Sequence, residues 1–403
     1  MKTKLLIFVL VIFSVLSFSK TKIVLWQFMM GDDVSKNILA GFEKENPDID
    51  VEVVQLSWAN GFDKIVTAFA ANAAPDVLEL GNTWVANFAK QGVLFDMSNT
   101  MKNNPEIVGW NQSEFNGKYW GVPWLLGTRA MYYNIDLFTK AGLDPTNPPK
   151  TWDEMLEAAK KIDALGSDIH GVAMASGEPY SPWQEWFLPA VWGNRGRVIS
   201  KDLKKATFNS IEVQEAAKFY KDLSKYALKT KISDLQAAFG EGKIGMWITG
   251  SGAISQLSST YPNTNFYVSY VPKPSNYRGF SASFAGGEIL TISNQSKKKY
   301  AAVKLINYLT RPEVAMKITK RVPAIFPSNS KASNDPWFED NPMSLIFFKQ
   351  NATAVPVPPH PKWGDIQTEV TSAIEEIILN NEDINKTLDK YNKKIQEILD
   401  NSK

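Results

Sequence analysis

Strand-like and helix-like segments alternate over the first part of the chain, and this order limits the possible folds more than any other feature. Short apolar runs at residues 23–27, 51–56 and 76–80 have the length and composition of buried strands. Amphipathic patterns at residues 33–46 and 61–72 separate them and have the period of helices. Neighbouring parallel strands need such a crossover, so the order predicts βαβ units on a parallel sheet.

The same order returns in the second half of the chain. Residues 121–143 join the halves, because extended chain is followed there by a helix that begins at Asn134 and ends at Gly142. We therefore expect two α/β units, although the chain contains no internal sequence repeat. Further strands are expected at residues 169–175, 243–249 and 266–271, and further helices at residues 152–165, 210–226 and 252–260.

Residues 1–19 differ from the rest of the chain. Lys2 and Lys4 precede an apolar run at residues 5–16, and Ser17-Phe18-Ser19 resembles a cleavage site between small residues. These features predict a secretory signal peptide that is cleaved after export. The apolar run is shorter than the ~20 residues that a membrane-spanning helix needs. Because the chain contains no cysteine, it has no site for a lipoprotein anchor, and we expect a freely soluble periplasmic protein.

The charge balance argues against two classes of partner. The whole chain carries 44 Lys and Arg against 42 Asp and Glu, and the predicted cleavage removes two lysines and no acid. The mature protein is therefore expected to be neutral. Binding to nucleic acid or to an anionic membrane needs an excess of basic surface, so we expect neither partner.

Catalytic motifs are scarce in this sequence. The chain has two histidines, His170 and His360, and each is expected to be structural. The glycine-containing motifs of α/β hydrolases, P-loop enzymes and dinucleotide-binding enzymes are absent. No Cys/His spacing suits a metal ion, and we expect neither a metal nor a cofactor. A secreted glycoside hydrolase stays open as an alternative, because it needs only two of the 42 acidic residues.

Aromatic residues are abundant where loops are expected to follow strands. The chain contains 13 tryptophans, and open α/β sheets bind ligands at the loops beyond the carboxyl ends of their strands. Flat rings at such positions suit the apolar faces of sugar rings. Core packing is the alternative for each of them, and it is the preferred interpretation for Trp186 and Trp192, which follow a helical pattern. The candidates for stacking are Trp26, Phe28, Trp58, Trp84 and Trp363.

Short motifs over nearly the whole of the expected mature chain resemble family 1 of the extracellular solute-binding proteins. Tyr133-Asn134, Leu137-Phe138 and residues 140–143 are similar to the signature of that family. No single motif is decisive, but their order and spacing together are specific. The match continues at Pro75-Asp76-Val77, at residues 239–243 and at Ala285-Gly286-Gly287.

The resemblance implies an α/β fold of two lobes, the type II periplasmic binding protein fold. In this fold each lobe is a mainly parallel sheet flanked by helices, and the ligand cleft lies between the lobes. Crossings between the lobes would fall near residues 125–128, 282–286 and 321–326. The expected division is residues 1–19 as signal peptide, 20–126 plus 284–323 as the N-terminal lobe, and 127–283 plus 324–403 as the C-terminal lobe.

The resemblance also implies a set of ligand contacts. Glu178, Tyr180 and Trp183 are similar to the acidic and aromatic segment that contacts sugar in the family. Trp124 stands beside the first expected crossing and is a further candidate. The polar or backbone candidates are Asn82, Ser251, Gly287, Glu288 and Arg321.

The function implied is that of a monomeric, non-catalytic periplasmic protein. It would bind a mono- or oligosaccharide between its lobes and deliver it to the permease subunits of an ABC transporter in the inner membrane. A binding protein for another small solute, such as glycerol phosphate or a polyamine, is an open alternative. Glu178 and Glu288 would then neutralise an amine, or Arg321 would hold an anion.

Overall fold

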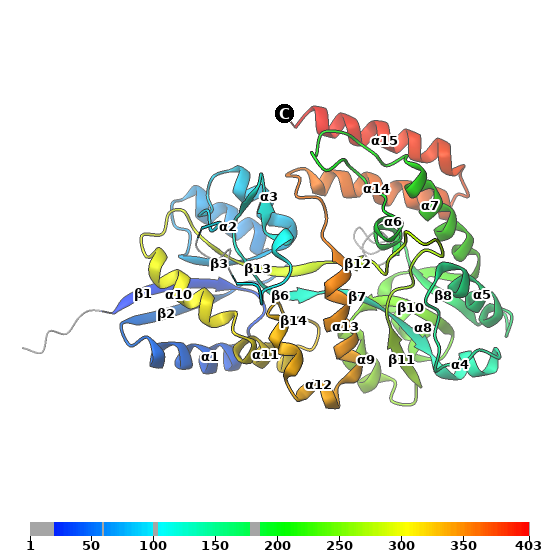
Figure 1. Ribbon diagram of the computed structural model, residues 1–403, viewed down its shortest axis with the longest axis horizontal. Helices are drawn as coiled ribbons and strands as arrows, with labels where there is room; N and C mark the ends of the chain where they lie inside the picture. Colours follow the sequence, from blue (N-terminus) through cyan, green and yellow to red (C-terminus); the bar gives the residue numbers. More distant parts are fainter. Residues whose placement is uncertain (1–19, 59, 100–103, 178–185, 403) are drawn as a thin grey trace, which may run out of the picture.

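Two sheets, each covered by helices on both faces, form two lobes that lie side by side (Figure 1). The computed structural model describes residues 20–402 except 59, 100–103 and 178–185. The predicted signal peptide therefore lies outside the described residues. Within the described part of the chain, no helix is long and apolar enough to cross a membrane.

The first sheet has six strands in the order β14-β6-β13-β3-β1-β2. β1, β2 and β3 are parallel to one another. β13 runs antiparallel to both of its neighbours, β3 and β6, and β14 runs antiparallel to β6. Four of the six strands thus share one direction. The bounds are β1 Thr21–Gln27, β2 Ile49–Gln55, β3 Val77–Gly81, β6 Val122–Gly127, β13 Gly286–Ile292 and β14 Phe326–Pro327.

Helices cover both faces of the first sheet. Ile23 and Leu25 of β1 pack with α1, α10 and α11 on one face, whereas Leu78 and Leu80 of β3 pack with α2 and α3 on the other. A strand that is buried on both faces is apolar along its whole length, which explains the continuous apolar runs in the sequence. The helices are α1 Asp32–Glu45, α2 Gly61–Ala70, α3 Asn82–Lys90, α10 Lys299–Leu309 and α11 Pro312–Arg321.

The second sheet has five strands in the order β11-β7-β10-β8-β9. Only β7 runs against the other strands described in this sheet. The predicted fold of two α/β lobes is confirmed. The strands of the second sheet are β7 Arg129–Asn134, β8 His170–Ala175, β9 Ala227–Thr230, β10 Ile244–Gly250 and β11 Phe266–Ser269. Two further sheets have two short strands each: β4 Glu114–Phe115 pairs with β5 Lys118–Tyr119, and β12 Ser283–Phe284 pairs with β15 Ala354–Val355.

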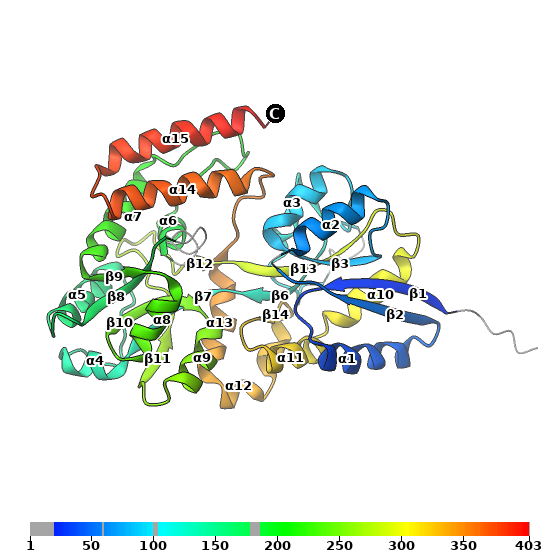
Figure 2. The ribbon, with the colours of Figure 1, turned by 180° about the vertical axis from the view of Figure 1, so that it is seen from behind.

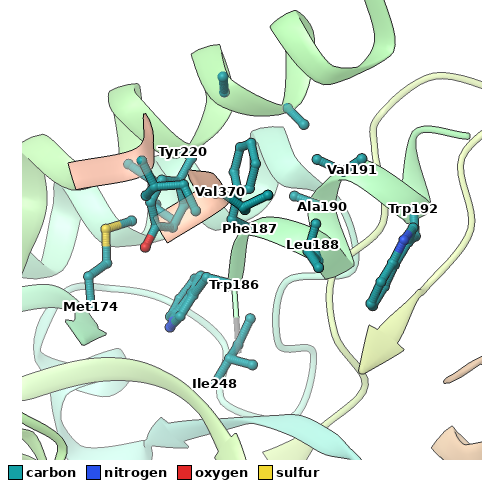
Figure 3. Close-up of a cluster of buried hydrophobic side chains, with 14 of the residues drawn as sticks. Met174, Trp186, Phe187, Leu188, Ala190, Val191, Trp192, Tyr220, Ile248 and Val370 are labelled. Atoms are coloured by element: carbon teal, nitrogen blue, oxygen red, sulfur yellow. The ribbon is translucent and has the colours of Figure 1, made fainter. Parts of the chain in front are cut away.

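A large apolar cluster fills one face of the second sheet (Figure 3). Trp186 and Trp192 are buried in it, so their interpretation as core residues is confirmed. The helices that pack on this face are α4 Ile135–Lys140, α5 Trp152–Asp163, α6 Leu188–Gly193, α7 Ile211–Leu223, α14 Trp363–Ile378 and α15 Ile384–Asp400. The opposite face packs against α8 Ile232–Gly240, α9 Gly252–Thr260, α12 Trp337–Asp340 and α13 Pro342–Gln350.

Two chain segments pass side by side between the sheets. β6 and β7 are separated by Thr128 alone, and Ala285 separates β12 from β13 (Figures 1 and 2). The Ser283 hydroxyl accepts a hydrogen bond from the Arg129 N–H at 2.9 Å and donates to the Arg129 carbonyl at 2.8 Å. The Thr128 hydroxyl lies 2.9 Å from the Phe284 carbonyl. These hydrogen bonds fix the two crossing segments to each other.

The division of the chain between the lobes stays a prediction in its details. Strand pairing adds one fact about the third crossing, because Phe326 and Pro327 of β14 pair with Leu126 and Leu125 of the first sheet. The chain is therefore still part of the first sheet beyond the predicted boundary at Pro323. It then passes into α12 and α13, which pack on the second sheet.

Gly171 gives a test of helix packing on the second sheet. A Cβ atom at this position of β8 would lie 2.6 Å from the Ala159 Cα in α5. We expect Gly171→Ala to lower the free energy of unfolding by about 1–3 kcal/mol, as overpacking of a core does. Gly364→Ala is the control, since a Cβ there meets no atom within 4 Å. Urea denaturation that gives equal stabilities for the two variants would contradict this packing.

Candidate ligand-binding site

The carboxyl ends of both sheets meet at the crossing. β3 ends at Gly81, which pairs with Glu288 of β13. In the other sheet, β10 ends at Gly250, which pairs with Arg129, the first residue after the crossing at Thr128. Ligands of α/β sheets bind beyond the carboxyl ends of strands. The strand registers thus bring the two candidate binding edges to opposite sides of one short crossing.

The loop after β1 is held by side chains of its own sheet. The Phe28 N–H donates to Glu79 Oε2 at 2.6 Å, and the Gln55 amide donates to the Phe28 carbonyl at 2.8 Å. Gln27 binds both backbone groups of Met30, accepting from its N–H at 2.6 Å and donating to its carbonyl at 2.8 Å. Polar side chains of three strands therefore order this loop at the carboxyl edge of the first sheet.

Three rings gather at the same edge, and we call Phe28, Trp58 and Trp84 the aromatic surface. Phe28 and Trp58 stack with centroids 4.1 Å apart and planes inclined by 18°. Trp84 lies 5.2 Å from Trp58 and 5.9 Å from Phe28. Gly61 leaves room for this arrangement, because a Cβ there would lie 2.5 Å from Phe28 Cζ. Phe28 is buried, whereas Trp58 is 45% exposed and presents its ring to solvent.

Trp26 does not belong to the aromatic surface. It was expected to follow the first strand, but β1 continues to Gln27 and Trp26 lies within it, opposite Val54 and Leu78. Its ring is partly buried against the apolar cluster beneath α2 and α3. The expected strand at residues 23–27 ends where β1 ends and already contains Trp26, so the assignment of Trp26 to the loop after that strand was wrong.

Polar residues connect α3 to the crossing strand. The Asn82 amide donates to Gln112 Oε1 at 2.9 Å and to the Ala285 carbonyl at 2.8 Å. Gly287 is buried beside them, and a Cβ there would lie 2.8 Å from Gln112 Oε1. The structure thus brings the predicted residues Asn82 and Gly287 together. Gln112 was not predicted, because nothing in its sequence neighbourhood distinguishes it from a surface glutamine.

Two acidic side chains meet between β3 and β13. Glu79 is fully buried, and its carboxyl group lies close enough to that of Glu288 for each to shift the pKa of the other. Burial raises the pKa of Glu79 to about 8, although the N–H groups of Phe28 and Met29 favour its charged form. Burial and the neighbouring Glu79 charge raise the pKa of Glu288 well above its ordinary value. Glu288 was predicted, whereas Glu79 was missed, although it is the one acid within the apolar run at residues 77–80.

The second lobe contributes one predicted residue that the structure describes at this edge. Ser251 directly follows β10 at the start of α9 and is buried, and its Oγ has no partner within the described part of the chain. Arg321, at the end of α11, is exposed, with its Nε 3.8 Å from Asp33 Oδ2. Glu178, Tyr180 and Trp183 lie outside the described residues. The described side chains include no group of three or more that suits a metal ion.

Comparison with known proteins decides the family. Residues 30–316 match the family described as bacterial extracellular solute-binding protein. This chain belongs to that family. Members of the family are binding proteins and not enzymes.

Individual solute-binding proteins match over nearly the full chain. A galactooligosaccharide-binding protein of Bacillus subtilis (strain 168) is 26% identical over 92% of this chain and 87% of its own. A solute-binding protein of an ABC transporter from Thermotoga lettingae, bound to α-D-tagatose, is 27% identical with a TM-score of 0.74, over 94% of this chain and 100% of its own. The sugar-binding protein MalE of Xanthomonas citri is 25% identical with a TM-score of 0.86, over 94% of this chain and 98% of its own.

Two tryptophans that were expected to contact a ligand lie in the cores of this solute-binding protein. Trp124 is fully buried in the first lobe, where its indole N–H donates to the Leu309 carbonyl at 3.0 Å. Trp363 is 3% exposed and packs in the apolar cluster of the second lobe. The structure contradicts both expectations, since helices that are distant in sequence cover these rings.

The burial of Trp124 predicts a role in stability. We expect Trp124→Ala to lower the free energy of unfolding by roughly 3–5 kcal/mol, because the substitution leaves a cavity and an unpaired Leu309 carbonyl. Tyr300→Ala, at a site that is 76% exposed, should leave the stability nearly unchanged. Chemical denaturation of both variants measures the difference, and equal unfolding midpoints would contradict the placement of Trp124.

Proposed function

We propose that this protein is the monomeric, periplasmic substrate-binding component of an ABC importer, exported with the help of residues 1–19. It holds a mono- or oligosaccharide between its two lobes and delivers the sugar to the permease subunits in the inner membrane. The observation that carries this proposal is the stacked pair of Phe28 and Trp58 at the carboxyl edge of the first sheet. Named sugar-binding relatives support it.

The edge has the chemistry that a neutral sugar requires. The exposed ring of Trp58 offers a flat apolar face, and Asn82 and Glu288 lie nearby on α3 and β13 with polar groups for hydroxyls. A micromolar affinity corresponds to about −8 kcal/mol. An aromatic contact contributes roughly 0.5–1.5 kcal/mol beyond area burial. Several contacts must therefore act together, with the predicted residues Glu178, Tyr180, Trp183 and Ser251 contributing from the second lobe.

A glycoside hydrolase is the less favoured alternative. Retaining and inverting hydrolases hold their two carboxyl groups roughly 5–5.5 Å or 6.5–9.5 Å apart, with the sugar between them. Glu79 and Glu288 instead lie next to each other on neighbouring strands, and Glu79 is fully buried. This pair leaves no room for a glycosidic bond. Incubation with oligosaccharides should release no product, and turnover by the pure protein would overturn the binding role.

A thermal-shift screen separates sugars from other small solutes. The screen would include neutral mono- and oligosaccharides, glycerol phosphate and a polyamine. A ligand at 100 times its dissociation constant adds about 2.7 kcal/mol of stability, so we expect a clear rise of the unfolding temperature with at least one neutral sugar. Stabilisation by glycerol phosphate or a polyamine alone would replace the sugar proposal with the alternative solute.

Trp58 provides a direct test of the aromatic surface. We expect Trp58→Ala to weaken binding of that sugar about threefold to tenfold, because one stacking contact is lost and the remaining contacts persist. Tyr277→Ala is the matched control, since Tyr277 is an 88% exposed aromatic residue far along the chain from the aromatic surface. Calorimetric titration measures both affinities. Equal affinities for Trp58→Ala and the wild type would remove Trp58 from the site.

A further inference from the structure

A pair of buried glutamates lies beneath the aromatic surface. β3 and β13 are antiparallel, with Glu79 opposite Leu290 and Glu288 opposite Gly81. This register places the two glutamates diagonally on the same face of the sheet. Glu288 as a residue is partly accessible, whereas its Oε2 atom is buried, and Glu79 is buried completely. The sheet therefore forces two carboxyl groups together in a site that excludes water.

The contact between these carboxyl groups requires a proton. An ionised carboxylate only accepts hydrogen bonds, so a hydrogen bond between two of them needs one protonated partner. Glu79 Oε1 and Glu288 Oε2 are both buried, and neither has a hydrogen-bond partner in the described part of the chain unless one of the two carboxyl groups carries a proton. Among the described residues, Glu288 is the one ionisable group that shifts the pKa of Glu79, and Glu79 is the one that shifts the pKa of Glu288. No cation of the described residues compensates the pair. One shared proton satisfies this arrangement.

Glu79 connects the pair to the aromatic surface. Its Oε2 accepts from the N–H groups of Phe28 at 2.6 Å and Met29 at 3.3 Å. The ring of Phe28 lies directly under Trp58. A carboxylate that accepts two backbone N–H groups fixes the loop that carries Phe28. The position of the exposed Trp58 ring thus depends on where the Glu79 carboxyl group is held.

We propose that Glu79 is a positioning residue for the aromatic surface and shares one proton with Glu288, so that loss of this proton loosens the surface and weakens ligand binding. Removal of the proton leaves two buried negative charges in contact, and they repel each other. One carboxyl group must then move or admit water, and the hydrogen bonds to Phe28 and Met29 weaken. The effect on the ligand rests on the proposed sugar-binding function, whereas the shared proton does not.

The direction of the pH dependence follows from the raised pKa values. The unfolded chain releases protons from both glutamates near the ordinary pKa of 4.5, whereas burial holds the pKa of both well above that value in the folded protein, at about 8 for Glu79. Stability from this pair is therefore greatest below pH 4.5 and is lost as the pH rises toward 8. When the folded protein holds one proton more than the unfolded chain, the ratio of unfolded to folded protein rises by up to about tenfold for each unit by which the pH increases in this interval.

The first experiment measures stability from pH 5 to pH 9 without any ligand. We expect Glu288→Gln to remove the part of the pH dependence that belongs to the pair, because its amide donates to the Glu79 carboxylate and does not titrate. Glu52→Gln is the matched control, because Glu52 lies on β2 and forms an exposed ion pair with Lys22 of β1. The stability profile of this control variant should parallel that of the wild type. Parallel profiles for the wild type and Glu288→Gln would overturn the shared proton.

The second experiment measures the affinity for the sugar found by the thermal-shift screen, at pH 6 and at pH 9. Wild-type affinity should fall several-fold at pH 9, whereas Glu288→Gln should change much less. Glu79→Leu should bind weakly at both pH values, and Glu79→Gln, which keeps an acceptor for the Phe28 N–H, should restore binding. Unchanged affinity in a folded Glu79→Leu variant, or an affinity of the wild type that does not depend on pH, would overturn the positioning role.

The two experiments separate the two proposals. If no sugar binds to the wild type at either pH, the proposed function fails, and the ligand-free stability profiles still decide whether the proton is shared. If Glu79→Leu does not fold, the comparison of the wild type with Glu288→Gln at the two pH values still tests the link to binding. A sugar that binds equally well to both proteins at both pH values then refutes that link.

Discussion

The pairing of β6 with β13 is the constraint on which the rest of the structure depends. β6 carries the chain out of the first sheet and β13 brings it back, and a single residue, Thr128, separates β6 from the first strand of the second sheet. The Ser283 and Thr128 hydroxyls bind the backbone of the adjacent crossing segment. Because so little chain lies between the sheets, their carboxyl edges must face the same crossing. A ligand site shared by two lobes follows from this topology.

Polar side chains of the strands then shape the edge of the first sheet. Gln27 and Glu79 are buried in strands, where a polar group without a partner costs stability, and Gln55 is exposed at the end of β2. Each of them instead binds the backbone of the loop after β1. Rigid strands thus hold a loop that carries part of the aromatic surface, which is the usual way in which an α/β scaffold presents a binding site. The acidic pair adds a proton to this support.

Local features of the fold were predictable from the sequence because they depend on neighbouring residues. Asn134 was expected to begin a helix, and its Oδ1 accepts from the Leu137 N–H at 2.9 Å at the start of α4. The strands β1 to β3 and the helices between them were predicted from periodicity, with small errors at their ends. Trp26 was misplaced for another reason, because it was counted with the loop after the first strand although the expected strand at residues 23–27 contains it.

The sequence alone determined the alternation of strands and helices, the start of the helix at Asn134 and the family, since these follow from periodicity and short motifs. Only the tertiary structure decided which aromatic rings face solvent. Trp58 and Trp124 are the same residue type near the same edge, but α10 supplies the Leu309 carbonyl that binds Trp124 in the core. The contact of Glu79 with Glu288 likewise needs the antiparallel register of β3 and β13. Contacts between residues so far apart in the chain leave no local pattern, because they arise only when the lobe closes on itself.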